Sequence, residues 1–102
     1  MKLLENKIAL ITGGSRGIGE SIVRKFAEHG ANIAFTYLSS EDKANALVAE
    51  LEAMGVKAKA YKSDAADFVA AEALVADILK EFGAIDICVN NAGISKDNLL
   101  LR

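Results

Sequence analysis

Four glycines fall within seven residues of this chain, in the stretch from Ala9 to Ile22 that reads ALITGGSRGIGESI. The run from Lys7 to Ile11 is short, mostly apolar and rich in β-branched residues, which is typical of a strand buried on both faces. Beyond the glycines, apolar residues recur at spacings of three and four, which predicts one face of a helix ending at His29-Gly30. These residues are Ile18, Ile22, Val23, Phe26 and Ala27. The stretch therefore predicts a strand, a tight turn and a helix.

The same succession repeats along the chain. Further strands are predicted at Asn32 to Tyr37, Lys57 to Lys62 and Ile85 to Asn90. A second helix is predicted to begin at Ser39 or Ser40 and to end at Gly55, and a third to begin at a capping Asp67. Their apolar faces are Ala44, Leu47, Val48, Leu51 and Met54 in the second helix, and Ala71, Leu74, Val75, Ile78, Leu79 and Phe82 in the third.

Strands that alternate with helices of this length pair in parallel, because each helix carries the chain back across the sheet. The predicted fold class is α/β, a Rossmann-type doubly wound parallel sheet of which this chain forms βαβαβαβ with strand order 3-2-1-4. The lysines of the third strand predict a sheet edge. The first and fourth strands are then neighbours, and a ligand is expected in the crevice at their carboxyl ends.

Composition limits the function classes. The 102 residues are enough for one domain, and a net charge of -2 argues against nonspecific nucleic-acid or anionic-membrane partners. The lone Cys88 cannot form an internal disulfide, and no run approaches the length of a membrane helix, so a soluble cytoplasmic protein is expected. Neither Cys88, which we expect to act as a small hydrophobe, nor His29 has a metal-ligand partner at the usual spacing, so no metal is predicted.

The glycine turn itself predicts an anion site. Glycines 13, 17 and 19 allow a tight turn and close backbone approach, and the amide groups that open a helix favour a phosphate or pyrophosphate. A turn without a ligand is the structural alternative. The spacing from Gly14 to Gly19 also fits a nucleoside-triphosphate loop, but Glu20 stands where such a loop needs lysine, and its carboxylate would repel the phosphates.

Three motifs resemble the short-chain dehydrogenase/reductase family: Thr12-Gly-x-x-x-Gly-x-Gly19, Asp64-Ala65 after the third strand, and Asn90-Asn-Ala-Gly93 after the fourth. The resemblance implies a dinucleotide site in which the glycine loop holds the pyrophosphate, Asp64 and Ala65 contact the adenine, and residues 91–94 face the ribose and nicotinamide. The candidate site residues are Gly13, Ser15, Arg16, Gly17, Ile18, Gly19, Tyr37, Leu38, Ser39, Asp64, Ala65, Asn91, Ala92, Gly93 and Ile94. Asn90 is interpreted as a structural tie between loops.

The end of the second strand indicates which dinucleotide is preferred. An NAD site usually places an acid there to accept from the ribose 2'-hydroxyl, but this chain has none before Glu41. Arg16 can supply a positive charge and Ser39 or Ser40 a hydroxyl, which favours the 2'-phosphate of NADP(H). A solvated loop charge is the alternative interpretation of Arg16.

Within the family, the opening around the glycine turn and the segment Asn90 to Arg102 (NNAGISKDNLLLR) resemble bacterial 3-oxoacyl-[acyl-carrier-protein] reductases. This chain has Asn6 before Lys7, where those reductases have glycine. Acetoacetyl-CoA reductases share much of the same pattern. The resemblance implies an NADPH-dependent reductase of fatty-acid biosynthesis that acts on acyl-carrier-protein substrates as a homotetramer. The family's proton donor is the tyrosine of a Tyr-x-x-x-Lys motif, and neither Tyr37 nor Tyr61 begins one.

Residues 1–102 are therefore expected to be the truncated dinucleotide-binding portion of a single Rossmann domain. They contain no catalytic residue, and they are expected to be inactive without the rest of a longer reductase. A module that binds a dinucleotide without turnover is the other possibility.

Overall fold

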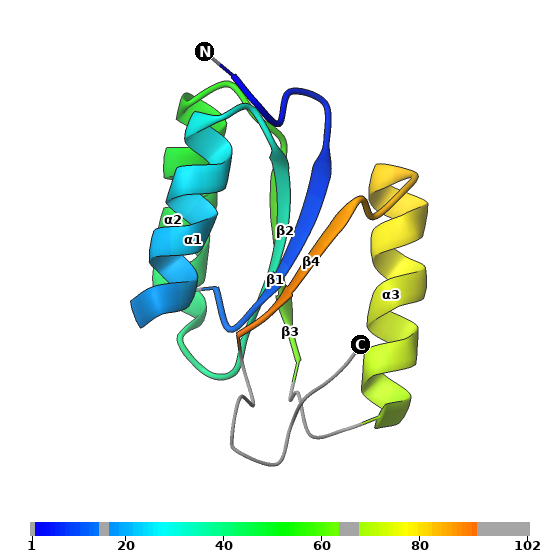
Figure 1. Cartoon of the computed structure of the whole chain (residues 1–102). Coiled ribbons are helices and arrows are strands. Elements are labelled where there is room, and N and C mark those ends of the chain that lie inside the picture. The colour runs from blue at the N-terminus through cyan, green and yellow to red at the C-terminus, as the bar shows by residue number, and fades with distance from the viewer. Residues whose placement is uncertain (1, 15–16, 64–67, 92–102) are drawn as a thin grey trace.

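The computed structural model describes residues 2–14, 17–63 and 68–91. Strands and helices alternate strictly along these ranges (Figure 1). Their order is β1 (Ile8–Thr12), α1 (Gly17–Glu28), β2 (Asn32–Tyr37), α2 (Glu41–Ala53), β3 (Ala58–Lys62), α3 (Phe68–Phe82) and β4 (Ile87–Asn90). The strands form one parallel sheet in the order β3-β2-β1-β4, which confirms the predicted fold class and topology.

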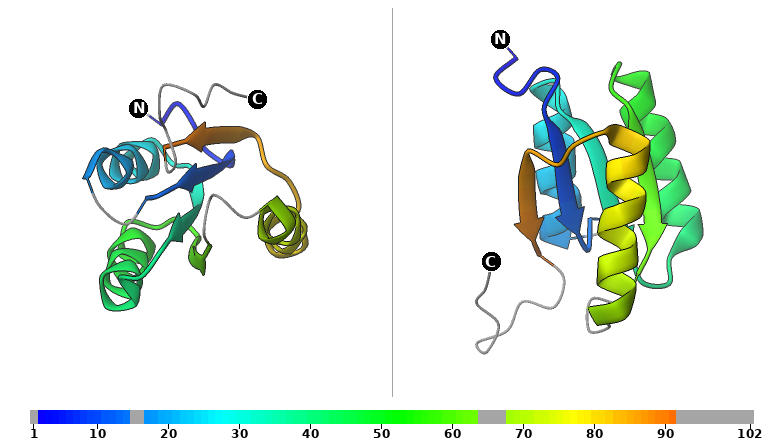
Figure 2. Two further views of the ribbon diagram at one scale, coloured as in Figure 1. Left: turned by 90° about the horizontal axis from the view of Figure 1, so that it is seen from below. Right: turned by 90° about the vertical axis from the view of Figure 1, so that its right-hand side faces the viewer.

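The sheet separates two unequal helical layers, seen end-on in Figure 2, with α1 and α2 on one face and α3 on the other. Under α1 and α2 lies the larger core, which includes the fully buried Phe35, Ile11, Ile33, Leu51 and Val23. The core beneath α3 is smaller, with Leu10, Ala34 and Ile78 buried at its centre. Because the strands are parallel, their carboxyl ends and the amino ends of the helices lie at the same edge of the sheet.

The predicted apolar faces are only partly confirmed. In α2, Ala44, Leu47 and Leu51 are buried, as the spacing predicts. In α3 the prediction is wrong for Val75 and Leu79, which are 40% and 45% exposed. Among the described residues α3 packs alone on its face of the sheet, so only the narrow stripe centred on Ile78 is covered. Asp67, predicted to cap this helix, lies outside the described residues.

Ile18 is a second exception. It was predicted to lie on the buried face of α1, yet its side chain is 73% exposed. Ile18 is the second residue of α1, and the buried side of this helix is formed by Gly19, Val23 and Ala27, so Ile18 points away from the sheet. The periodicity therefore identifies the helix correctly and misplaces its first apolar residue.

Both edge strands carry features that fix their position. On β3, the side chains of Lys59 and Lys62 are exposed, as the alternation of lysines predicts for a sheet edge. The strand at the other edge, β4, begins two residues later than predicted, because Asp86, just before it, is hydrogen-bonded to β1. The main-chain N–H of Asp86 donates to the Ile8 carbonyl at 2.8 Å, and the Ile8 N–H donates to Asp86 Oδ2 at 2.9 Å.

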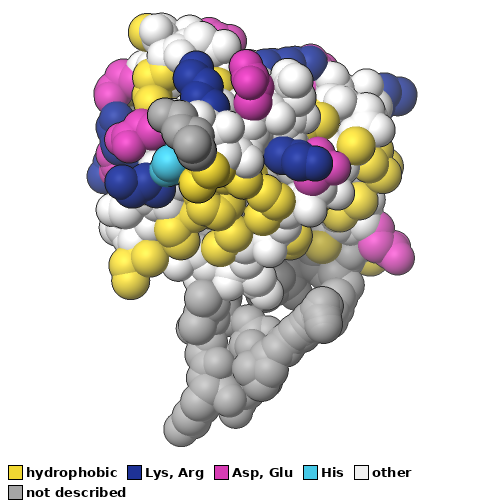
Figure 3. Space-filling view, turned by 45° about the horizontal axis from the view of Figure 1, so that its top comes forward, with side chains coloured by type: hydrophobic (Ala, Val, Ile, Leu, Met, Phe, Trp, Pro, Cys, Tyr) yellow, Lys and Arg dark blue, Asp and Glu magenta, His cyan; other side chains and the backbone are white. Residues whose placement is uncertain are grey.

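Cys88, in the middle of β4, is exposed rather than buried as a small hydrophobe. Partial desolvation nevertheless raises the pKa of its thiol, which favours the unreactive protonated form. The face shown in Figure 3 carries lysine and arginine side chains interspersed with aspartate and glutamate, around a group of hydrophobic side chains. Among the described residues of this face, the charges therefore do not form a basic surface of the kind that binds nucleic acid.

Candidate functional site

The glycine loop is fastened to the neighbouring strand by Thr36. The Gly13 N–H donates to Thr36 Oγ1 at 2.8 Å, and the Gly14 N–H donates to the Thr36 carbonyl at 3.0 Å. Thr36 is only 3% exposed and is the one polar residue in the otherwise apolar interior of β2. One buried threonine therefore satisfies two consecutive amide groups at the point where the chain leaves β1.

Replacing Thr36 with valine keeps the shape and the β-branching of the side chain but removes the acceptor for the Gly13 N–H. Since an unsatisfied donor away from water is costly, we expect unfolding free energy to fall by about 1–2 kcal/mol. Urea unfolding of the full-length protein measures the change. Thr36→Ser keeps the hydroxyl and should lose less, and a valine variant as stable as the serine variant would contradict this role for the hydroxyl.

The helix that follows the loop lies unusually close to it. A Cβ placed on Gly19 would lie 2.1 Å from the Gly13 carbonyl oxygen and 2.7 Å from Nδ2 of Asn91. Asn91 Nδ2 in turn donates to the same Gly13 oxygen at 3.2 Å. The first turn of α1, the end of β1 and the residue after β4 therefore meet at Gly13, and only glycine at position 19 allows this contact.

A second tie joins the ends of β1 and β4. Thr12 and Asn90 are register partners, and Thr12 Oγ1 donates to Asn90 Oδ1 at 3.0 Å. This is the structural tie that was expected of Asn90. The Asn91 amide is likewise engaged within the protein, through Gly13, so the adjacent asparagines hold together the two loops that flank the predicted crevice.

The opening of α1 is shaped for close approach from outside. Gly13 and Gly17 have positive φ angles of 68° and 63°, in the region that side chains disfavour, so the chain turns sharply before the helix. Gly17 and Ile18 are exposed, and Gly19 is buried. The amide groups of this first turn therefore face the carboxyl edge of the sheet, where helix geometry favours an anion.

The end of β2 lies beside this turn and behaves as a boundary between core and surface. Tyr37 is 8% exposed and belongs to the core, while Leu38 is 63% exposed and Ser39 is also exposed. The Tyr37 carbonyl accepts from the Ser63 N–H at 3.0 Å, which fixes the end of β3 next to it. Of these predicted site residues, Leu38 and Ser39 present side chains at the surface and Tyr37 does not.

Seven predicted site residues lie outside the described residues: Ser15, Arg16, Asp64, Ala65, Ala92, Gly93 and Ile94. Of the others, the structure brings Gly13, Gly19 and Asn91 into contact. It also places Gly17 and Ile18 at the opening of α1, and Leu38 and Ser39 at the end of the adjacent strand.

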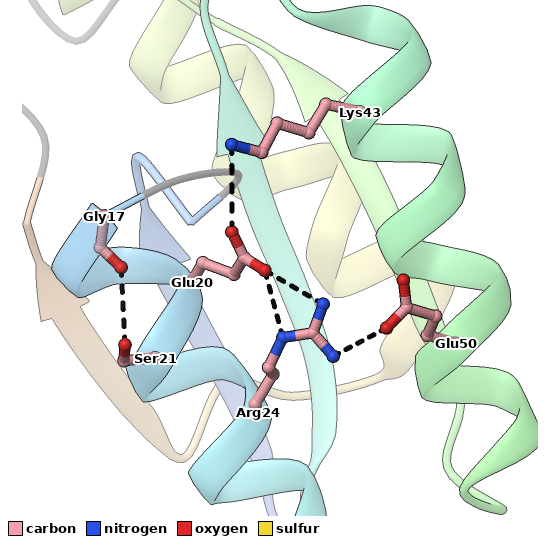
Figure 4. A network of polar contacts seen from close by, with 6 residues as sticks. All are labelled: Gly17, Glu20, Ser21, Arg24, Lys43 and Glu50. Carbon is pink, nitrogen blue, oxygen red and sulfur yellow. Dashed lines mark hydrogen bonds and ion pairs between the residues drawn. The ribbon is translucent and has the colours of Figure 1, made fainter.

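Glu20, whose carboxylate argues against a nucleoside-triphosphate loop, is part of an ion-pair network between α1 and α2 (Figure 4). Its Oε2 accepts from Arg24 Nε at 3.0 Å, and Arg24 is also bound to Glu50 Oε1 at 2.7 Å. The two carboxylates, that of Glu50 first, raise the pKa of Arg24, and Arg24 lowers the pKa of Glu50. On the other side of Glu20, Lys43 Nζ lies 3.9 Å from Oε1.

Sequence reasoning missed two residues of this site. A Cβ on Gly14 would lie 2.7 Å from Phe35 Cβ, so this glycine serves packing and not ligand approach. Thr36 was counted only as part of a strand. A signal for Thr36 was present, because a lone hydroxyl in a fully buried strand beside a glycine turn needs a partner, and the turn offers unsatisfied amides.

Within residues 2–14, 17–63 and 68–91, no helix combines the length and apolar character that a membrane span needs. Nor do the residues described there bring three histidine, cysteine or acidic side chains together as metal ligands.

The parallel sheet, the glycine turn and the asparagine tie together define a dinucleotide-type α/β domain, and comparison with known proteins identifies its family. The short chain dehydrogenase family model matches residues 7–101. The chain therefore belongs to the short-chain dehydrogenase/reductase family.

Two curated relatives are each 47% identical in sequence to this chain. The chain is 47% identical over 97 residues to a 3-oxoacyl-[acyl-carrier-protein] reductase of Staphylococcus epidermidis, covering 95% of this chain and 40% of that protein. It is 47% identical over 94 residues to an L-rhamnose 1-dehydrogenase (NAD(P)(+)) of a Sphingomonas species, covering 92% of this chain and 37% of that protein. The chain thus spans about 40% of the length of the curated relatives it matches.

A solved structure shares both fold and sequence. The short chain dehydrogenase from Burkholderia cenocepacia in complex with NADP superposes with a TM-score of 0.86 at 48% identity. The match covers 96% of this chain and 42% of that one. Similarity at this level confirms the Rossmann-type fold that the strand order defines.

Proposed function

We propose that the full-length protein carrying this chain is an NADP(H)-dependent oxidoreductase that reduces 3-oxoacyl groups on acyl carrier protein to 3-hydroxyacyl groups in fatty-acid biosynthesis. Residues 1–102 would form the dinucleotide-binding portion of a single Rossmann domain. The observation that carries the dinucleotide part of this proposal is the contact of Gly19 with the Gly13 carbonyl and Asn91, because it packs the opening of α1 against the ends of β1 and β4, where a pyrophosphate is expected.

The residues of the chain fit a dinucleotide. Gly17 and Gly19 put no side chain at two positions in the first turn of α1, while Ile18 in the same turn and Leu38 after β2 are exposed apolar side chains. In the proposed arrangement Gly13 to Gly19 hold the pyrophosphate, Asp64 and Ala65 the adenine, and Asn91 to Ile94 the ribose and nicotinamide side. Bound NADPH would supply the hydride.

The preference for NADP(H) over NAD(H) rests on charge. No acid lies between Asn32 and Ser40, so β2 lacks the carboxylate that usually accepts from the ribose 2'-hydroxyl in an NAD site. Glu20, the acid at the start of α1, already has a cationic partner in Arg24. A relative at 48% identity was solved with NADP, and Arg16 is the residue that we assign to the 2'-phosphate.

The Arg16 assignment is tested by titrating the full-length protein with NADPH and with NADH. A charge-assisted contact to phosphate contributes about 1.5–3 kcal/mol, so Arg16→Ala should weaken NADPH binding by about 10-fold or more and leave NADH binding nearly unchanged. Intrinsic fluorescence quenching gives both dissociation constants. Equal loss of both affinities, or no loss, would count against this role for Arg16.

Substrate class is supported by the Staphylococcus epidermidis relative and by the segment from Asn90 to Arg102. Acetoacetyl-CoA reductases share much of that sequence pattern. A sugar dehydrogenase is the second candidate, because the L-rhamnose 1-dehydrogenase is also 47% identical to this chain. Three assays of the full-length protein distinguish these candidate substrates. Two follow NADPH oxidation, with acetoacetyl groups on acyl carrier protein and with acetoacetyl-CoA. The third follows NADP reduction with L-rhamnose. Turnover only with the sugar would overturn the proposed substrate.

Two further properties belong to the same proposal. The protein would act in the cytoplasm, and it would assemble as a homotetramer, as its family resemblance implies. If dinucleotide binds but no carbonyl or alcohol substrate is turned over, a non-catalytic binding module would replace the enzyme.

A further inference from the structure

The ion-pair network between α1 and α2 holds its two cations very differently. Arg24 is bound on both sides, by Glu20 at 2.9 Å and by Glu50 at 2.7 Å. Within the described part of the chain Lys43 has one ion pair, with Glu20 Oε1 at 3.9 Å, which is beyond hydrogen-bond distance. Both oxygens of Glu20 are thus in use, but only Arg24 is tightly held. Lys43 is the cation of this network that a stronger anion could take over.

The position of Lys43 suggests which anion that is. Lys43 is the third residue of α2, and it follows Ser39 and Ser40 at the carboxyl end of β2. In dinucleotide-binding sheets the end of the second strand is where the adenosine ribose and its 2' substituent lie. Figure 4 shows the Lys43 side chain extending from α2 toward Glu20 on α1. Its ammonium group therefore lies between the first turns of α1 and α2.

The local hydroxyl groups fit the same ligand. Ser40 is the N-cap residue of α2, yet its side chain makes no capping hydrogen bond. Ser39 is exposed. Two hydroxyls and an ammonium group thus lie within five residues at one strand end. Glu41 and Asp42 are exposed in the same helical turn, so a phosphate bound there needs a cation to offset their charge.

We propose that Lys43 is a specificity-determining residue for the 2'-phosphate of NADP(H), and that Glu20 holds it near that position until the cofactor binds. The inference rests on the proposed dinucleotide function and adds a residue that the sequence motifs do not include. On binding, Lys43 moves its charge from the Glu20 carboxylate to the phosphate. A phosphate monoester carries a charge of about -1.5 to -2 at neutral pH, so it attracts the ammonium group more strongly than one carboxylate does.

Lys43→Ala should weaken NADPH binding by about 10-fold at low salt and leave NADH binding unchanged, because only NADPH carries the 2'-phosphate. Lys43→Arg should retain most of the preference. The difference between the alanine variant and the wild type should shrink as salt is raised, since Lys43 is half exposed and its charge is screened. Adenosine 2',5'-bisphosphate, compared with AMP, isolates the contribution of the phosphate.

Glu20→Gln removes the carboxylate that competes for Lys43, so NADPH affinity should rise by about 2- to 5-fold while NADH affinity stays constant. Glu50→Gln is the matched control, because it removes a carboxylate from Arg24 without freeing Lys43. Lys25→Ala is the control for loss of a surface lysine, since Lys25 pairs with Glu28 in the last turn of α1, at 3.7 Å. Neither control should change the ratio of the two affinities.

The outcomes separate the inference from the function on which it rests. If the wild type binds neither NADPH nor NADH, the proposed function fails. If it prefers NADPH and Lys43→Ala leaves the ratio of NADPH to NADH affinity unaltered, or lowers both affinities equally, the role of Lys43 is wrong and the function stands. Unchanged circular dichroism of each variant is required before the affinities are compared.

Discussion

Replacing Gly19 with alanine is expected to destroy the dinucleotide site. The added Cβ would lie 2.1 Å from the Gly13 carbonyl oxygen and 2.7 Å from Asn91 Nδ2. Because the first contact is with backbone, the clash can be relieved only if α1 moves away from the end of β1. That movement separates the helix opening from the loop and breaks the hydrogen bond from Asn91 to Gly13. We expect overpacking to cost about 3 kcal/mol of stability and NADPH affinity to fall by about 100-fold or more.

Urea unfolding and NADPH titration of the full-length protein measure the two effects. Gly83→Ala provides a matched control outside the site: nothing lies within 4 Å of its Cβ position, and only its positive φ of 89° opposes the change. That variant should lose about 1–2 kcal/mol of stability and no NADPH affinity. A Gly19→Ala protein with the affinity of the wild type would show that the close contact is not needed for binding.

The strand order can be predicted from the sequence because the residues that begin and end each strand and helix are recognisable. The predicted second strand, Asn32 to Tyr37, agrees residue for residue with β2, since glycine and alanine precede it and exposed serines follow it. The alternation of strand and helix then leaves few ways to order four parallel strands. The first strand begins one residue later than predicted and the fourth two residues later, because hydrogen bonding around Asp86 decides where pairing starts.

The site is less predictable, because its geometry depends on contacts between residues far apart in the chain. Periodicity placed Ile18 in the core, but the buried side of α1 is formed by Gly19, Val23 and Ala27 and leaves Ile18 exposed. The sequence identifies Glu20 only as a charge that would repel a nucleoside triphosphate. In the structure Glu20 pairs with Arg24 on its own helix and with Lys43 on the neighbouring helix α2. A motif reports which residues approach the ligand, and it does not report which neighbours hold those residues in place.

Gly14 is the second position where alanine should have a large effect, and here the cause is core packing. A Cβ on Gly14 would lie 2.7 Å from Phe35 Cβ and 2.9 Å from Val23 Cγ2. Both neighbours are fully buried, and the Cβ of Phe35 cannot move without its strand. Gly14→Ala should therefore lower the unfolding free energy of the full-length protein by about 2–3 kcal/mol. The measurement is the urea midpoint at one fixed protein concentration, because an oligomer would make it concentration-dependent.

A double-mutant cycle with Val23 tests whether this clash is the cause. Val23→Ala alone leaves a cavity and should cost about 2 kcal/mol of stability. In the Gly14→Ala background it also removes one clashing methyl group. The double mutant should therefore lose about 1 kcal/mol less than the sum of the two single losses. Ile78→Ala is the control partner, because Ile78 lies in the core on the opposite face of the sheet and its loss should add to that of Gly14→Ala. If Val23→Ala is as additive as Ile78→Ala, the destabilisation at Gly14 does not arise from contact with Val23, and Phe35 alone would have to account for it.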